Sequence, residues 1–458
     1  MMNTTRALKT NNLNSRQREG GTWYPCTQMQ RLEDAPPIAI QRASGVWLYD
    51  QEGNRYLDGI SSWWVNLFGH NHPKINAAIQ QQLKNFSHIM LAGLTHEPVM
   101  ELSARLTAVA PSGLSHCFYA SDGASAVEIA LKMSHHYWRN LDKPGKSTFI
   151  SLANGYHGET LGSLSVTDVA LFKEAYAPLL FESMRLPSPD WRNAASKETA
   201  RDFAIRCIAT LESHLRDNSE NVAAFILEPL VQGAAGMAMY HPEYLSHARQ
   251  ICDRYQIHLI ADEIAVAFGR TGTMFACEQA NIAPDFMCLS KGLSGGYLPL
   301  SVVIATNDIY EAFYDGDIKR GFLHSHSYTG NALACSAALA VLDIFADEQV
   351  LAANKQKSAH LNKLVATFVG HPQIKNFRNT GMIWAFDIKG VDQHFAQNFH
   401  RHALKNGLLL RPIGNTVYWM PPYVISSEEM EFLVENTFKT LEQTLKHCHS
   451  ERAFSPRT

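Results

Sequence analysis

The chain has no strong excess of charge of either sign, because 40 basic residues stand against 43 acidic ones and the formal net charge is -3. Nucleic acids and anionic membranes attract proteins with a strongly basic footprint. The near balance therefore argues against either partner and favours a small-molecule ligand. Since 46% of the residues are hydrophobic and 18% are charged, the composition is that of a globular protein and excludes disorder of the whole chain.

Cysteine motifs and long apolar runs are also missing. The eight cysteines form no CxxC pair and no close cluster with histidine, so we expect neither a disulfide framework nor a bound metal. The opening stretch MMNTTRALKTNNLNSRQREG is polar, and no run of about 18 apolar residues follows, which predicts neither a secretory signal nor a membrane span. We therefore expect a cytoplasmic protein with reduced thiols.

What the chain does contain is an alternation of two patterns. Between about residues 115 and 305, short apolar stretches such as VAAFIL and IHLIAD alternate with amphipathic ones such as PEYLSHARQICDRY. This alternation predicts an α/β fold with a mostly parallel sheet that helices cover on both faces. Upstream, VWLYD followed by QEGNRYLDG predicts a β-hairpin.

Three polar residues directly follow apolar strands: Glu228 after AAFIL, Asp262 at the end of IHLIAD and Lys291 after FMCLS. Open α/β sheets bind ligands at this edge. A lone lysine is usually a solvated surface residue, but GLSGG follows this one, and glycines let backbone approach a ligand closely. A lysine here can form a Schiff base with an aldehyde, and the aspartate can keep a pyridine nitrogen protonated.

The segment SDGASAVE, from residue 121 to 128, joins a strand to a helix. Amides at a helix N-terminus, beside a glycine, can bind a phosphate, although a Ser or Asp at this place is ordinarily an N-cap. A phosphate anchor, a partner for a ring nitrogen and an aldehyde-trapping lysine together indicate pyridoxal 5'-phosphate.

The segments LIADEIAVAFGRTGTMFACE and PDFMCLSKGLSGGYLPLS resemble the signature of class III, fold type I, pyridoxal-phosphate-dependent aminotransferases. More narrowly, WYPCTQM, SSWWVNLFGHNHP, NGYHGET and LLLRPIGNTVYWMPPY resemble members of biotin biosynthesis that use S-adenosylmethionine as amino donor and 8-amino-7-oxononanoate as acceptor. The resemblance implies the fold type I α/β architecture, in which a large domain carries the mostly parallel sheet. It also implies a smaller α/β lobe built from the N- and C-terminal segments.

With this architecture we expect four regions along the chain. Residues 1–20 form a mobile tail, and residues 21–75 form the N-terminal segment of the small lobe. Residues 76–345 form the large domain that binds pyridoxal phosphate, and residues 346–458 form the C-terminal small domain.

The resemblance assigns the cofactor-binding residues within one chain. Lys291 is the Schiff-base lysine, Asp262 the partner of the pyridinium nitrogen, and Tyr156 stacks its ring on the cofactor. Gly123 and Ala124 supply backbone amides to the phosphate. We expect Lys291, Asp262 and Tyr156 to be the catalytic residues.

The segment HSHSYTG implies a contribution from a second copy of the chain. Ser327 falls where the family places a hydroxyl residue that reaches the phosphate of the neighbouring subunit, with Ser325 and His326 beside it. We therefore expect Ser327 and His326 to contact the cofactor and Ser325 the substrate. The resemblance thus implies a homodimer with shared active sites, in which a monomer is inactive.

The resemblance also assigns substrate-binding residues, and Tyr156 is one of them. Arg411 corresponds to the arginine that clamps the carboxylate of the amino-oxononanoate through two parallel hydrogen bonds. Trp63 and Trp64 lie where the family has an aromatic wall. At most one of them is expected to face the pocket, and we assign Trp63 to the substrate-binding residues. Cys26 stands where some members have a substrate-binding tyrosine, so its position carries over but not that role. Ala265 replaces a glutamine typical of relatives that act on ornithine or γ-aminobutyrate.

We expect the protein to catalyse a ping-pong transamination. Three other functions compete with this interpretation. The closest is that of a class III ω-aminotransferase with lysine, ornithine or γ-aminobutyrate as donor, which shares every cofactor residue. A nucleotide-binding oxidoreductase needs GxGxxG after the first strand of a βαβ unit, and this chain lacks it. A non-catalytic relative is disfavoured because Lys291, Asp262 and Tyr156 are all present.

Overall fold

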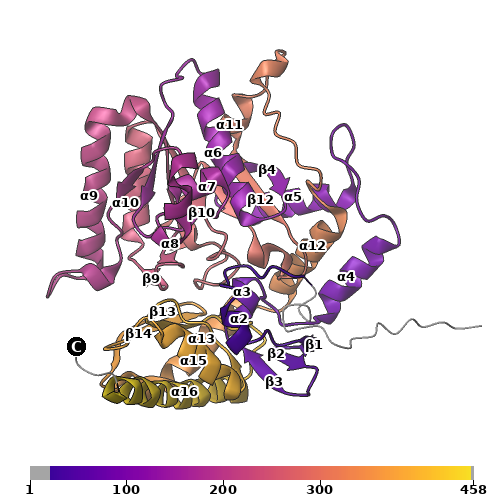
Figure 1. Cartoon of the computed structure of the whole chain (residues 1–458). Coiled ribbons are helices and arrows are strands. Elements are labelled where there is room, and N and C mark those ends of the chain that lie inside the picture. Colours follow the sequence, from indigo (N-terminus) through magenta and orange to yellow (C-terminus); the bar gives the residue numbers. More distant parts are fainter. Residues whose placement is uncertain (1–20, 455–458) are drawn as a thin grey trace, which may run out of the picture.

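The fold is described for residues 21–454 by a computed structural model, so the predicted tail over residues 1–20 lies outside the described part. A seven-stranded sheet forms the centre of the larger domain (Figure 1), in the order β4-β12-β11-β10-β7-β5-β6. These strands are β4 (Leu114–Ala120), β5 (Thr148–Leu152), β6 (Met184–Leu186), β7 (Val222–Leu227), β10 (His258–Asp262), β11 (Phe286–Leu289) and β12 (Ser301–Thr306). Only β12 runs antiparallel to its neighbours, so the sheet is mostly parallel, as predicted.

Helices cover both faces of this sheet, and the side chains of β10 show it directly. Ile260 belongs to a buried cluster with Val127 of α6, whereas Leu259 and Ala261 belong to a second cluster with Ala248 of α10. Neighbouring residues of a strand point to opposite faces, so both faces of β10 are buried. The helices of this domain are α4 (Pro73–Leu83), α5 (Glu97–Val109), α6 (Gly123–Asn140), α7 (Leu161–Val166), α8 (Ala170–Lys173), α9 (Ala200–Asn218), α10 (Glu243–Arg254), α11 (Asn307–Glu311) and α12 (Ala332–Asp347).

The smaller lobe lies below the large domain in Figure 1 and is built from both ends of the chain. Its four-stranded sheet has the order β1-β2-β3-β15, and Leu57 of β3 pairs with Leu408 of β15. The predicted hairpin is present, because β2 and β3 pair antiparallel with Trp47 opposite Leu57. These strands are β1 (Ile40–Ser44), β2 (Trp47–Asp50), β3 (Arg55–Asp58) and β15 (Leu408–Leu409).

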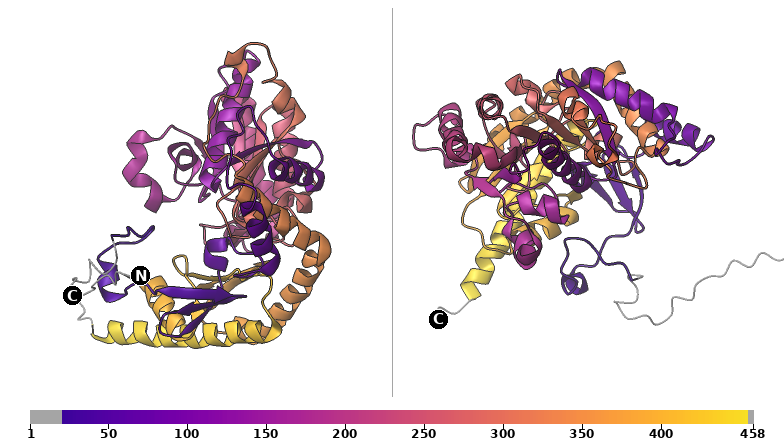
Figure 2. Two further views of the ribbon diagram at one scale, coloured as in Figure 1. Left: turned by 90° about the vertical axis from the view of Figure 1, so that its right-hand side faces the viewer. Right: turned by 90° about the horizontal axis from the view of Figure 1, so that it is seen from above.

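A three-stranded sheet, β13-β14-β16, and a long C-terminal helix complete this lobe. Figure 2 (left) shows α16 along the base of the molecule with the N-terminal strands directly above it, and Trp47 Nε1 donates a hydrogen bond of 2.7 Å to Glu429 Oε1 of that helix. The elements are α13 (Val350–Leu364), α14 (Ala366–Val369), β13 (Ile374–Thr380), β14 (Ile383–Ile388), α15 (Phe395–Lys405), β16 (Thr416–Trp419) and α16 (Ser427–Phe454). The exact domain boundaries stay a prediction.

Four further short elements are α2 (Arg31–Asp34), which precedes β1, α3 (Ser61–Trp64), which lies between β3 and α4, and β8 (Val231–Gln232) and β9 (Ala238–Met239), which pair with each other between β7 and α10. Within residues 21–454, no helix combines the length and the apolar character that crossing a membrane requires.

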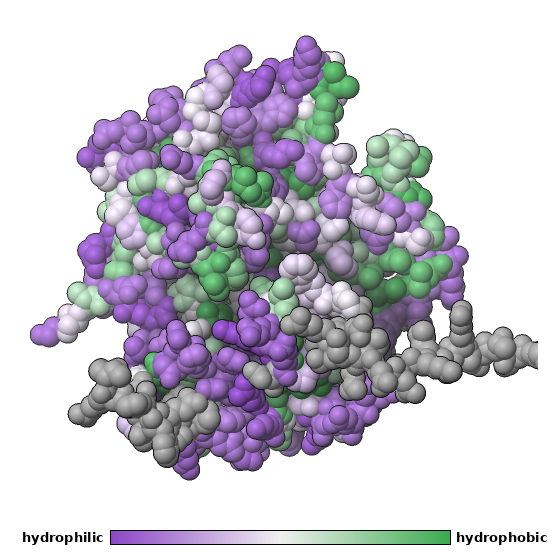
Figure 3. Space-filling model, viewed as in Figure 1, coloured by the Kyte–Doolittle hydropathy of each residue, from purple (hydrophilic) through white to green (hydrophobic). Residues whose placement is uncertain are grey.

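The face of the molecule in Figure 3 is mostly hydrophilic, but hydrophobic residues gather on the side that carries α4, α5 and the segment between them. Exposed side chains of this region are Leu83, Met90, Leu94 and Met100. Clustered exposed apolar residues are typical of a contact surface.

Candidate active site

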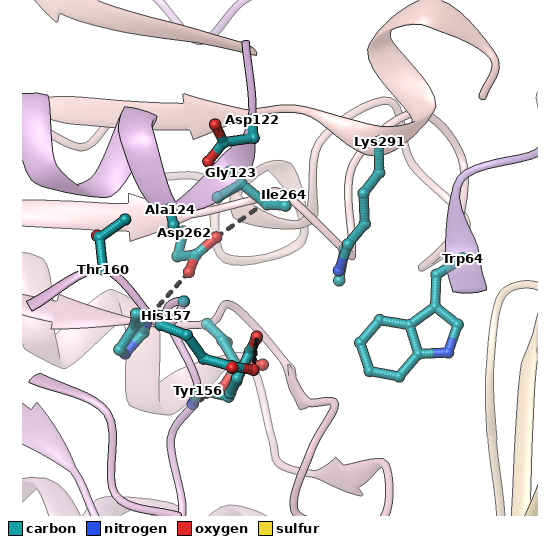
Figure 4. A pocket seen from close by; sticks show the side chains of 14 residues that line it. Trp64, Asp122, Gly123, Ala124, Tyr156, His157, Thr160, Asp262, Ile264 and Lys291 are labelled. Atoms are coloured by element: carbon teal, nitrogen blue, oxygen red, sulfur yellow. Dashed lines mark hydrogen bonds and ion pairs between the residues drawn. The ribbon is translucent and has the colours of Figure 1, made fainter. Parts of the chain in front are cut away.

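A cavity of about 380 Å³ opens where β7, β10 and β11 end. Figure 4 shows its walls converging from separate segments of the chain. The lining residues are Trp64, Asp122, Gly123, Ala124, Tyr156, His157, Gly158, Glu159, Thr160, Glu228, Asp262, Ile264, Ala265 and Lys291. The five cofactor residues expected within one chain are therefore together, at the edge of the sheet that the strand pattern predicted.

Lys291 enters this cavity from the second residue after the end of β11, with its side chain half-buried. Its Nζ lies 4.4 Å from the centroid of the Trp64 ring. Burial lowers the pKa of Lys291 to about 8, although the carboxylates of Asp262 and Glu228 oppose that shift. A sizeable neutral fraction of the amine is thus present near neutral pH, which a nucleophile or a base requires.

Asp262 is held from two sides at the end of β10. His157 Nδ1 lies 2.8 Å from Asp262 Oδ2, and the Ile264 amide donates to Oδ1 at 3.2 Å. Both the His157 and the Asp262 side chains are buried. His157 Nε2 has no hydrogen-bond partner among residues 21–454. The second ring nitrogen of His157 thus makes no further hydrogen bond within this part of the chain. Sequence reasoning missed His157, although it follows Tyr156 in NGYHGET.

Tyr156 is fixed at its backbone and at its hydroxyl. Its amide donates to Glu228 Oε2 at 2.9 Å, and its hydroxyl donates to Glu159 Oε1 at 3.0 Å. Glu228 also accepts the Gly233 amide at 2.9 Å through Oε1. Burial raises the pKa of Glu228 to about 7 and raises the pKa of Tyr156 well above its ordinary value. The Tyr156 phenol therefore stays protonated at neutral pH.

The N-terminus of α6 forms one end of the cavity. The Asp122 carboxylate caps the helix by accepting the Ser125 amide at 2.9 Å, and the amides of Gly123 and Ala124 belong to the first turn, where no helical acceptor exists. A Cβ at Gly123 would lie 3.0 Å from the Ile264 side chain, so a glycine is needed for this close packing. Free amides and the helix dipole suit a phosphate group.

The two adjacent tryptophans take different places. Trp64 lines the cavity, and its Nε1 donates to the Tyr418 hydroxyl at 3.0 Å. Trp63 is 46% exposed and lies outside that lining, where the Arg411 guanidinium carbon is 5.2 Å from its ring centroid. One tryptophan thus faces the pocket, as expected, but it is Trp64, which we had not included among the substrate-binding residues.

Arg411 brings the other expected substrate residues together. Its Nη2 donates to the Cys26 carbonyl at 3.2 Å while its guanidinium covers Trp63. Burial and the nearby Glu159 carboxylate raise the pKa of the Cys26 thiol, so the thiol is neutral at pH 7. Cys26, Trp63 and Arg411 form a cluster that we call the entrance cluster, and Glu159 connects it to Tyr156.

Ser325, His326 and Ser327 do not line the cavity of their own chain. His326 Nε2 lies 3.1 Å from the Ser121 hydroxyl, and the Ser327 carbonyl lies 2.7 Å from His88 Nε2. The Ser325 and Ser327 side chains are exposed. A single chain therefore leaves these two hydroxyls on the surface, near the segment that leads into α6.

The chain matches the family model "Aminotransferase class-III" over residues 28–441. It is 44% identical over 432 residues to the adenosylmethionine-8-amino-7-oxononanoate aminotransferase of Helicobacter pylori, an alignment that covers 93% of this chain and 96% of that protein. A solved structure of the same name from Methanocaldococcus jannaschii superposes with a TM-score of 0.87 at 33% identity, over 93% of this chain and 98% of that one. The omega transaminase of Pseudomonas jessenii in complex with PMP superposes with a TM-score of 0.90 at 27% identity, over 95% of this chain and 99% of that one.

These matches extend over both lobes and confirm the fold type I α/β architecture. They also confirm the family that the segments around Asp262 and Lys291 indicate. The chain belongs to the class III aminotransferase family.

Proposed function

We propose that this protein transfers an amino group from S-adenosylmethionine to 8-amino-7-oxononanoate, giving 7,8-diaminononanoate in biotin biosynthesis, with pyridoxal 5'-phosphate as cofactor. The names of the Helicobacter pylori and Methanocaldococcus jannaschii relatives support this activity. The observation that carries the proposal is one cavity in which Lys291 and Asp262 face the N-terminus of α6, with Arg411 close by.

The residues present fit pyridoxal phosphate. Lys291 offers an amine to its aldehyde, Asp262 a carboxylate to its ring nitrogen, and the amides of Gly123 and Ala124 a site for its phosphate. The cavity contains no cluster of cations for the phosphate, which accords with the low net charge of the chain. When bound, the cofactor supplies an electron sink that stabilises negative charge on the carbon bearing the transferred amino group.

The chain's own residues orient the reactants and move the proton. Lys291 Nζ moves the proton at the substrate carbon, because its pKa of about 8 lets it accept and return a proton near neutral pH. The buried Asp262 carboxylate would hold the ring nitrogen of the cofactor in its protonated form, and His157 Nδ1, 2.8 Å from Asp262 Oδ2, fixes the orientation of that carboxylate. Tyr156 would stack on the cofactor ring, and the hydrogen bond from its hydroxyl to Glu159 holds the phenol in place.

The entrance cluster selects the acceptor. The Arg411 guanidinium binds the carboxylate at the far end of 8-amino-7-oxononanoate through two parallel hydrogen bonds, and the Trp63 ring beneath it limits its rotation. Ser325 contacts the substrate. Cys26, the third member of the entrance cluster, accepts a hydrogen bond from Arg411 at its carbonyl. A single arginine and an aromatic wall suit a pocket that takes two unlike substrates in turn.

We further propose a homodimer in the cytoplasm, in which Ser327 and His326 complete the phosphate site of the neighbouring subunit. The exposed apolar side chains support an association: Met90 is 59%, Leu323 70% and Tyr328 60% exposed. Met90 and Tyr328 lie in the two segments that the contact between His88 Nε2 and the Ser327 carbonyl connects. All cysteines described in residues 21–447 are free thiols, which accords with a reducing compartment.

Single-turnover reactions of the cofactor-loaded protein test the donor and the acceptor together. S-adenosylmethionine, lysine, ornithine and γ-aminobutyrate are each mixed with the enzyme, and 8-amino-7-oxononanoate is then added. We expect S-adenosylmethionine to convert the cofactor fastest and 8-amino-7-oxononanoate to reverse the conversion. Faster conversion by lysine, ornithine or γ-aminobutyrate would instead make the protein an ω-aminotransferase with that donor.

A further inference from the structure

The residues of α3, Ser61–Trp64, form one turn of left-handed helix. Their φ angles are 50°, 46°, 70° and 72° in chain order, and the Trp64 amide donates to the Ile60 carbonyl at 2.9 Å. Residues other than glycine adopt this conformation singly, because Cβ then meets the following carbonyl. Four such residues in succession need support from the surrounding structure.

Asp58 provides that support from the end of β3. Its fully buried carboxylate accepts the Ser62 amide at 2.8 Å through Oδ1 and the Ser62 hydroxyl at 2.7 Å through Oδ2. His70 Nε2 lies 3.0 Å from Oδ2. The His70 amide donates to the Gly45 carbonyl at 2.8 Å, so the backbone of His70 is anchored to the turn between β1 and β2. The carboxylate thereby fixes both the backbone and the side chain of the second residue of the turn.

The turn decides where the two tryptophans point. Trp64 lies against Lys291, with Nζ 4.4 Å from its ring centroid, and it is held by Tyr418. Trp63 lies under Arg411, 5.2 Å from the guanidinium carbon. In a right-handed turn the chain would wind in the opposite sense and would not present these two adjacent rings at both places. The handedness of α3 thus connects the reacting amine to the entrance cluster.

We propose that Asp58, supported by His70, is a positioning residue for acceptor selection: it holds the left-handed turn that places Trp63 beneath Arg411 and Trp64 beside Lys291. This inference rests on the proposed function for its substrate. Asp58 itself does not line the cavity, so it acts through the two tryptophans. Its removal loosens the support of Arg411 and weakens binding of the acceptor carboxylate more than it slows the chemistry.

Four variants of the cofactor-loaded, full-length enzyme test the proposal. We expect Asp58→Ala to raise KM for 8-amino-7-oxononanoate by at least about tenfold, with a smaller change in kcat. Adding Ser62→Gly to Asp58→Ala should recover most of that loss, because glycine adopts positive φ without a Cβ penalty. Ser62→Val, with Asp58 intact, should reproduce the defect because a β-branched residue resists this φ. Gln256→Val is the matched control, since Gln256 is exposed, has a φ of 50° and lies away from the cavity.

Gln256→Val should lower the melting temperature and leave KM unchanged. Crystal structures of Asp58→Ala and Ser62→Val provide a readout that needs no substrate, and the φ angles of residues 61–64 should leave the left-handed region. The proposal is overturned if the turn persists in both variants, or if Ser62→Gly recovers none of the lost affinity. If the wild-type enzyme fails to use 8-amino-7-oxononanoate at all, the proposed function falls, while the φ angles still decide whether Asp58 holds the turn.

Discussion

His157 Nδ1 lies 2.8 Å from Asp262 Oδ2 in the core of the large domain, where both side chains are buried. The Ile264 amide fixes the other oxygen of the same carboxylate at 3.2 Å. A buried carboxylate without partners would favour its protonated form. The imidazole and the amide therefore fix the orientation of the Asp262 carboxylate from both of its oxygens.

Replacement of His157 tests this relationship. His157→Leu removes the donor, and since a hydrogen bond to a charged group contributes about 1.5–3 kcal/mol, we expect kcat to fall roughly 10- to 100-fold. His157→Asn keeps an amide group near the position of Nδ1 and should lose much less. The losses in kcat and in affinity for pyridoxal phosphate, the latter followed by absorbance titration, should both be larger for His157→Leu than for His157→Asn. Equal losses in the two variants would contradict a role for the Nδ1 contact.

The strand-end residues of the site were predictable because their position depends on local apolar patterns. Glu228, Asp262 and Lys291 each end or follow a strand whose residues are buried on both faces. The three strands are neighbours in the sheet, so their carboxyl ends necessarily meet. The hairpin of β2 and β3 was predictable for the same reason, since its apolar strands flank a short polar turn.

Other features depend on contacts that no local pattern encodes. The left-handed turn at Ser61–Trp64 opposes local preference, and it exists because Asp58 and Met420 hold it, the latter by accepting the Ser61 hydroxyl at 2.7 Å. The bond from Arg411 to the Cys26 carbonyl joins residues 385 positions apart. Such long-range packing overrides local propensity. The sequence alone therefore could not show that Trp64, and not Trp63, lines the cavity.

The pKa of Lys291 predicts how the apoenzyme captures its cofactor. Burial lowers this pKa to about 8, so the neutral amine becomes more abundant as pH rises through 8. We expect the second-order rate of pyridoxal phosphate binding, measured by stopped-flow absorbance between pH 6.5 and 9.5, to be half-maximal near pH 8. A free lysine side chain, with a pKa of about 10.4, is the reference and should still be rising at pH 9.5. An inflection of the enzyme at that higher pH would contradict the effect of burial.

Glu263 predicts a dependence of stability on pH that is separate from catalysis. Its buried carboxyl accepts the Ala276 and Cys277 amides at 2.9 and 2.8 Å, and burial raises its pKa from 4.5 to about 7. A raised carboxyl pKa means that the folded state holds a proton that the unfolded state has lost between pH 4.5 and 7. Stability therefore falls as pH rises through this window, by about 3 kcal/mol from this group.

Glu263→Gln isolates that contribution, because the amide does not titrate. The variant should be less stable than wild type at pH 5, where one backbone amide loses its acceptor, and the difference should narrow or reverse by pH 8. Urea unfolding of the holoenzyme at both pH values measures it. A difference that stays constant between the two pH values would show that Glu263 titrates at its ordinary pKa.

Replacement of Arg411 should weaken binding of the acceptor, 8-amino-7-oxononanoate. Arg411→Ala removes the guanidinium above Trp63 and its bond to Cys26, and the loss of a paired, charge-assisted contact to the acceptor carboxylate should raise KM for 8-amino-7-oxononanoate by roughly 10- to 100-fold. Arg411→Lys keeps the charge but not the two parallel bonds, so its KM should lie between those of the alanine variant and wild type. Arg216→Ala, on the exposed side of α9, controls for the loss of one positive charge and should leave KM unchanged. Steady-state kinetics with the donor saturating provide the measurement. If Arg411→Ala and Arg216→Ala gave the same KM, the carboxylate would have to bind elsewhere in the cavity.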